Sequence, residues 1–146
     1  MEIHHAKMTI IAELDNNIRY YRSGILKINP MEQEAVNQLI RFMTACKKLD
    51  MALIMKEKDA LRVVIGNLLY DSLEAGSLSR EFTIIWTTTI HQTNMFYNKC
   101  MLLCELMEGG INGDEYKTKE KEESDEMIIR IQDHISLEVL EELVSP

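Results

Sequence analysis

The chain has 146 residues, of which 46% are hydrophobic and 27% are charged, and its formal net charge is −8 at pH 7. That length suits one domain with a real hydrophobic core, so we expect residues 1–146 to form a single domain. The negative charge argues against partners that are themselves polyanionic, which are nucleic acids and acidic membrane surfaces.

The first half of the sequence predicts three helices, because apolar residues recur there every three or four positions and only six Gly and two Pro interrupt the chain. The first helix spans about residues 3–22 and ends at Gly24. The second begins with a helix-start signature, in which Asn29 caps, Pro30 takes the first turn and Glu32 completes a capping box. It runs to about residue 47.

The third predicted helix covers about residues 50–75, and the pattern leaves open whether KKLD joins it to the second. Its predicted core face is Ile54, Leu61, Val64, Ile65, Leu68, Leu69 and Leu73. A fourth helix spans about residues 80–108, with Ser77 or Ser79 as its cap. Its first part, EFTIIWTTTI, has strand-like composition, but the larger apolar period is helical.

The charged stretch INGDEYKTKEKEESDE predicts a flexible loop over about residues 111–124. A last helical region follows, with a break and a new cap at Ser136. The predicted fold is therefore an all-α antiparallel bundle of five or six helices.

Two carboxylates, Glu105 and Glu108, end the fourth predicted helix. On a helical wheel they point away from its apolar side, which predicts an ordinary solvated face. The segments KCMLLCELMEGG and KEESDEMIIRIQD, within about residues 99–135, resemble the signature of the MazG-type all-α nucleotide pyrophosphohydrolases.

That resemblance implies an alternative function, a Mg²⁺-dependent hydrolase of nucleoside triphosphates. It implies that Glu105 and Glu108 form one metal-binding pair and that Glu122 and Asp125 form the second. The pair Glu123 and Glu126 aligns better with the residues that follow. Without the resemblance, no cofactor is expected, because the chain has no Gly-rich phosphate loop, G-x-S-x-G or H-E-x-x-H motif.

Three cysteines, Cys46, Cys100 and Cys104, cannot all pair within one chain, and the N-terminus lacks the features of a signal peptide. These features favour reduced thiols and a cytoplasmic location. Cys100 and Cys104 share one side of the fourth predicted helix, where core packing is expected.

By elimination, the leading interpretation is a small acidic module that binds another protein, acting as an inhibitor, an adaptor or an immunity-type partner. A basic partner would meet the acids Asp114, Glu115, Glu120, Glu122 and Glu123. Trp86 is expected in the core, and otherwise as a hot spot for the partner. A third interpretation is a homo-oligomer whose seam is the helix from Arg80 to Glu108.

Overall fold

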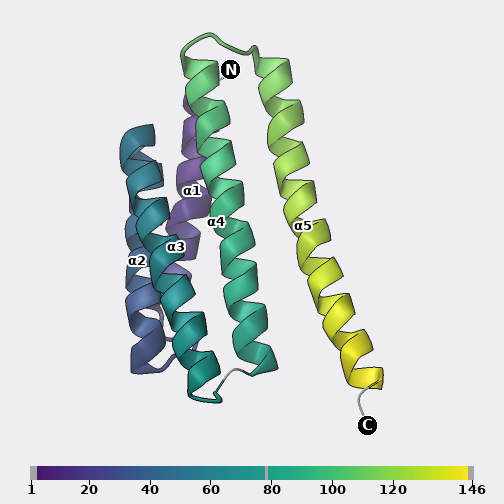
Figure 1. The fold of residues 1–146 in the computed structure, drawn as a ribbon. Helices are drawn as coiled ribbons and strands as arrows, with labels where there is room; N and C mark the ends of the chain where they lie inside the picture. The colour runs from purple at the N-terminus through teal and green to yellow at the C-terminus, as the bar shows by residue number, and fades with distance from the viewer. Residues whose placement is uncertain (1–2, 78, 145–146) are drawn as a thin grey trace.

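The computed structural model describes residues 3–77 and 79–144, with the side chains of residues 80, 81, 131 and 133–144 left undescribed. In this part of the chain, five helices run alternately down and up, and no strand is present (Figure 1). They are α1 (Ile3–Arg22), α2 (Pro30–Lys48), α3 (Met51–Glu74), α4 (Arg80–Met107) and α5 (Gly113–Val144). The predicted all-α bundle is confirmed.

The start of α2 has the capping chemistry that the sequence predicts. The Asn29 side chain accepts a hydrogen bond from the backbone N–H of Glu32 at 2.9 Å, and the Glu32 carboxylate accepts one from the N–H of Asn29 at 3.5 Å. Pro30 occupies the first turn, where its missing N–H costs nothing. Of the two candidates for the cap of α4, Ser77 and Ser79, the structure shows Ser79, which accepts a hydrogen bond from the N–H of Phe82.

A tight turn separates α2 from α3, which answers the question that the KKLD segment leaves open. Leu49 adopts a left-handed conformation with φ of 55° and donates its N–H to the carbonyl of Cys46. Asp50 then caps α3 by accepting hydrogen bonds from the N–H groups of Ala52 and Leu53. Local capping therefore reverses the chain within two residues.

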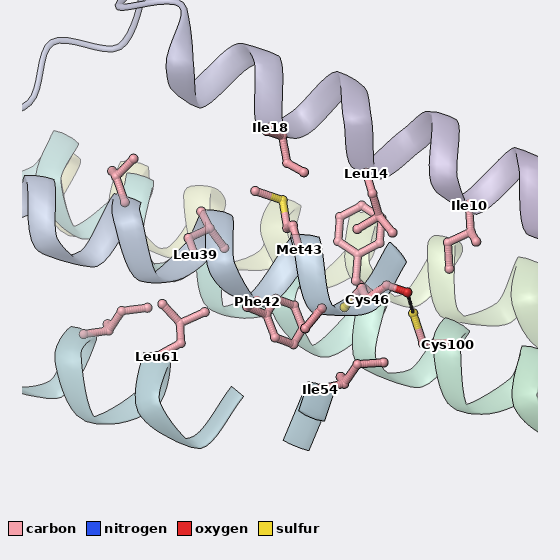
Figure 2. Close-up of a cluster of buried hydrophobic side chains, with 14 of the residues drawn as sticks. Ile10, Leu14, Ile18, Leu39, Phe42, Met43, Cys46, Ile54, Leu61 and Cys100 are labelled. Carbon is pink, nitrogen blue, oxygen red and sulfur yellow. Dashed lines mark hydrogen bonds between the residues drawn. The ribbon is translucent and has the colours of Figure 1, made fainter. Parts of the chain in front are cut away.

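The core lies between α1, α2, α3 and α4, which pack as an antiparallel four-helix arrangement. Figure 2 shows Leu14 from α1, Phe42 and Met43 from α2 and Ile54 from α3 converging on one cluster. All four of these side chains are fully buried. The apolar period of each segment therefore decides which side of the helix turns inward.

The helix α4 is central, because it contacts each of the other four helices. The predicted apolar period holds along it from Phe82 to Leu103, all of whose members are buried. Trp86 is 1% exposed, and its indole Nε1 donates a hydrogen bond to the Glu32 carboxylate at 3.2 Å. The strand-like composition of this segment is overridden because a helix places all these side chains in the core.

The charged segment is not a loop, contrary to the sequence prediction for residues 111–124. The helix α5 begins at Gly113, and it continues through residue 136, where a break was predicted. Asn112 supplies the start of this helix by accepting a hydrogen bond from the N–H of Glu115, and Tyr116 packs into the core at 6% exposure. The acids and lysines of this segment alternate along a helix surface, where i,i+4 pairs such as Lys121–Asp125 form.

Candidate functional site

The five acids predicted to bind a partner all lie on α5, but they do not form one free surface. Asp114, Glu115 and Glu122 are exposed. Glu120 forms an ion pair with Lys99 at 3.0 Å, and the Glu123 carboxylate accepts a hydrogen bond from the Asn98 amide at 3.0 Å. Two of the five therefore hold α5 against α4. Trp86, the sixth predicted partner residue, is buried in the core.

Lys99 is the most unusual charged residue of the described chain, because it is buried at 4% exposure. Its ammonium group lies 3.5 Å from the carboxylate of Glu13 on α1 and 3.0 Å from that of Glu120 on α5. The carboxylate side chains are 40% and 32% exposed and stay partly hydrated. One buried cation thus connects α1, α4 and α5. Sequence reasoning missed it, because a lysine next to the apolar residues of a helix is usually exposed to solvent.

The structure does not gather the four carboxylates that the MazG resemblance implies. The contacts of Lys99 with Glu120 and of Asn98 with Glu123 fix the register of α4 against α5. In that register, Glu122 is level with about residue 98, which is about 10 Å along the helix from Glu105. In the described part of the chain, no group of three or more His, Cys, Asp or Glu side chains is arranged to hold a metal ion.

The three thiols lie together on the α2 and α4 sides of the core. Cys46 and Cys100 are fully buried, and the Cys100 thiol lies 3.8 Å from the carbonyl of Cys46 (Figure 2). The pKa of Cys46 is raised by its hydrogen bond with Cys100 and by burial. The half-buried Cys104 donates its S–H to the carbonyl of Leu49 at 3.5 Å, and burial raises its pKa. The raised pKa values of Cys46 and Cys104 and the full burial of Cys100 make these thiols packing groups rather than nucleophiles.

We expect a thiol-specific disulfide reagent to modify Cys104 slowly in the folded protein and to reach Cys46 and Cys100 only after unfolding. The physical reason is that a raised pKa and burial both lower the concentration of accessible thiolate. Release of the chromophoric thiol from Ellman's reagent, with and without denaturant, measures this difference. The variant Cys104→Ser should abolish the slow native reaction. Fast modification of all three thiols in the native state would contradict the packing described.

A second apolar face lies on the outside of α3. We define the outer face of α3 as eight exposed residues, namely Ala52, Met55, Asp59, Arg62, Val63, Gly66, Tyr70 and Leu73. At about 100° per residue they fall within an arc of about 100°, whose centre lies about 140° from that of the buried side of the helix. The exposed polar residues Lys56, Asn67 and Glu74 lie beside this arc. Its four large apolar members are 50% to 63% exposed, and they are Met55, Val63, Tyr70 and Leu73.

The outer face contains two charged residues, Asp59 and Arg62, and both lie close to its middle. Asp59 and Arg62 form only a long ion pair at 3.9 Å, with side chains 65% and 81% exposed. Within the described residues, α3 packs only on α2 and α4, and neither of them covers this face (Figure 1). Leu73, predicted to lie in the core, belongs to the outer face instead.

An apolar groove of about 350 Å³ borders the outer face, between α3 and α4. Leu61, Ile65 and Leu69 form its α3 wall, and Ile90 belongs to its α4 wall. Arg62 and Gly66 belong to both the groove and the outer face. The volume lies in the range of about 300–1,000 Å³ typical of ligand pockets, so the groove has room for an inserted apolar side chain.

Sequence reasoning missed this surface, although a signal is present in the chain. The segments MALIM, VVI and LLY place apolar residues all around α3, whereas a helix that covers a core from one side needs only one apolar stripe. The additional hydrophobic residues exceed what one covered side of the helix needs. Only the tertiary structure identifies which side the chain itself leaves uncovered.

Comparison of the chain with protein-family models, with curated proteins and with solved structures finds no match. Within the described residues, none of the helices combines the length and the apolar character needed to traverse a lipid bilayer.

Proposed function

We propose that this protein is a small acidic binding module that acts through protein–protein contact, with the outer face of α3 and the adjoining groove as its docking surface. The observation that carries the proposal is that α3 is apolar on two sides and is covered on one. Large exposed apolar side chains gathered on one helix face, here on either side of Asp59 and Arg62, mark interaction sites in soluble proteins. The unpaired thiols Cys46, Cys100 and Cys104 support a cytoplasmic setting.

The shape of the surface suggests the chemistry of the partner. The outer face follows one helix for residues 52–73, a length of about 33 Å, so it matches a second helix laid alongside it. The groove beside it would take an anchoring apolar side chain from that helix. Lys58 lines the groove and holds its ammonium group 4.1 Å from the centre of the Tyr97 ring, and Thr93 and Asn94 add polar groups to the α4 wall. An amphipathic helix of a protein partner therefore fits best.

We expect the double substitution Val63→Glu and Tyr70→Glu to abolish capture of a partner from the native host, because it places carboxylates where apolar side chains must be desolvated. Both positions are exposed, so stability should change by no more than about 0.5 kcal/mol per site. Met8→Glu is the matched control, because Met8 is an equally exposed apolar residue on α1. Equal recovery of partners by the double variant and by Met8→Glu would contradict the proposed surface.

An assay of nucleotide hydrolysis tests the proposed binding function independently. A binding module should release no pyrophosphate from nucleoside triphosphates in the presence of Mg²⁺. If the wild type releases pyrophosphate and the variants Glu105→Ala and Glu108→Ala do not, the protein is the hydrolase that the MazG resemblance implies, and the proposed binding function is wrong.

A further inference from the structure

We propose that α5 is a hinged arm, which opens away from α4 while the bundle of α1 to α4 stays folded. Figure 1 shows α5 standing outside that bundle and joined to α4 by the loop that follows Met107. Within the described residues, α5 packs closely on α4 and on none of the other three helices. The outer face of α3 takes no part in this opening, so the hinged arm is independent of the proposed function.

The hydrophobic core is almost complete without α5. All buried core residues of the described chain lie on α1 to α4, except for Tyr116. Among the described side chains of α5, Tyr116 is the one that is buried, and Met127 is half-buried. Burial of apolar surface is the main favourable contribution to folding. Release of α5 therefore leaves most of the stabilisation of α1 to α4 in place, and α5 itself gains little from docking.

The described contacts that hold α5 against α4 are mainly polar. Glu120 forms the ion pair with the buried Lys99 at 3.0 Å, and Glu123 accepts the hydrogen bond from Asn98 at 3.0 Å. The net contribution of each such contact is modest, because opening exchanges it for contacts with water. Residues of α1 and α5 also line a cavity of about 180 Å³, so these two helices are not tightly packed. The arm is held at a few points along its length.

The loop between α4 and α5 has the properties of a hinge. Two consecutive glycines lie in it, and Gly109 has a φ of 80°, a conformation that side chains other than glycine disfavour. The start of α5 does not depend on α4, because Asn112 accepts a hydrogen bond from the N–H of Glu115 within α5 itself. Rotation about Gly109 and Gly110 therefore moves α5 as a unit.

Opening exposes one particular cation. Lys99 is 4% exposed in the closed arrangement, where Glu13 of α1 and Glu120 of α5 share its charge. Release of α5 removes Glu120 and uncovers the side of α4 on which Lys99 lies. Cys46 on α2 is fully buried in the core of the remaining bundle. Opening of the arm thus makes the Lys99 amine accessible and leaves the Cys46 thiol protected, whereas global unfolding exposes both.

Two measurements on the full chain test the opening. In hydrogen exchange followed by mass spectrometry, the amides of residues 117–130 should be at least about tenfold less protected than those of α2 and α3. In parallel, brief acylation with an amine-specific reagent should modify Lys99, under conditions in which a thiol reagent leaves Cys46 unmodified. Peptide mass spectrometry locates both modifications.

Substitutions on the arm should change the acylation rate of Lys99. Glu120→Gln removes a charge that pairs with Lys99 and should raise this rate about tenfold, which corresponds to about 1.4 kcal/mol in the opening equilibrium. Tyr116→Ala removes the buried ring of the arm and should raise the rate further. Glu122→Gln is the matched control, because it removes the same charge from an exposed residue of α5 and should leave the rate unchanged.

Three outcomes overturn the inference. The first is that Lys99 and Cys46 become reactive together in the wild type, because α5 then opens only when the whole chain unfolds. The second is equal acylation of Lys99 in Glu120→Gln and Glu122→Gln, because Glu120 then does not hold the arm closed. The third is loss of Cys46 protection in Glu120→Gln or Tyr116→Ala, because the bundle then depends on α5.

Discussion

Replacing Glu13 and Glu120 together with Gln should lower the free energy of unfolding by about 3 kcal/mol, because it leaves a buried cation without a counter-charge. The Lys99 side chain is 5% exposed, and water cannot substitute for the lost carboxylates. Urea denaturation followed by far-UV circular dichroism measures the effect. A loss much below about 1 kcal/mol would mean that the Lys99 charge is hydrated in solution and that the three helices are not held at this point.

The informative control is removal of the cation itself. Lys99→Met keeps the length and apolar stem of the side chain and leaves two carboxylates that are already 40% and 32% exposed. They can hydrate, so we expect Lys99→Met to cost no more than about 1 kcal/mol. In the triple variant, Lys99→Met should recover most of the stability that the two Gln substitutions remove. If removing the two carboxylates costs much more stability than removing the ammonium group, the desolvation of Lys99, rather than its attraction to the carboxylates, dominates the energy of this site.

Trp86→Ala should be destabilising by about 3–5 kcal/mol, because it empties the largest fully buried side-chain volume of α4. It also removes the indole donor to the Glu32 carboxylate, which is 8% exposed and belongs to the capping box of α2. Thermal and urea unfolding monitored by circular dichroism provide the measurement.

Truncation of an exposed aromatic residue is the control that separates the effect of burial from the effect of losing an aromatic ring. Tyr70 is 63% exposed on the outer face of α3, so Tyr70→Ala should change the stability of the monomer by no more than about 0.5 kcal/mol. Trp86→Phe should fall between the two, because it keeps most of the volume but leaves Glu32 without its indole donor. Equal losses for Tyr70→Ala and Trp86→Ala would contradict the placement of these helices.

Helix starts were predictable because their chemistry is local. Asn29, Pro30 and Glu32 are within four positions of one another, and the two capping hydrogen bonds join only Asn29 and Glu32. The prediction of a loop at residues 111–124 was wrong because it relied on the charge of the segment and overlooked the local helix start at Asn112. A run of mixed charges lowers the helical signal, but Asn112 begins a helix there and Tyr116 holds it against the core.

The sequence by itself determined the all-α class, the approximate boundaries of α1 to α4 and most of their inward-facing residues, because a period of three to four residues is a property of neighbours along the chain. Only the tertiary structure decided that Lys99 is shared by Glu13 and Glu120, since these residues meet through the packing of three helices. It also decided which apolar side of α3 stays uncovered. Exposure depends on where the other helices lie, and a pattern of hydrophobic residues does not contain that information.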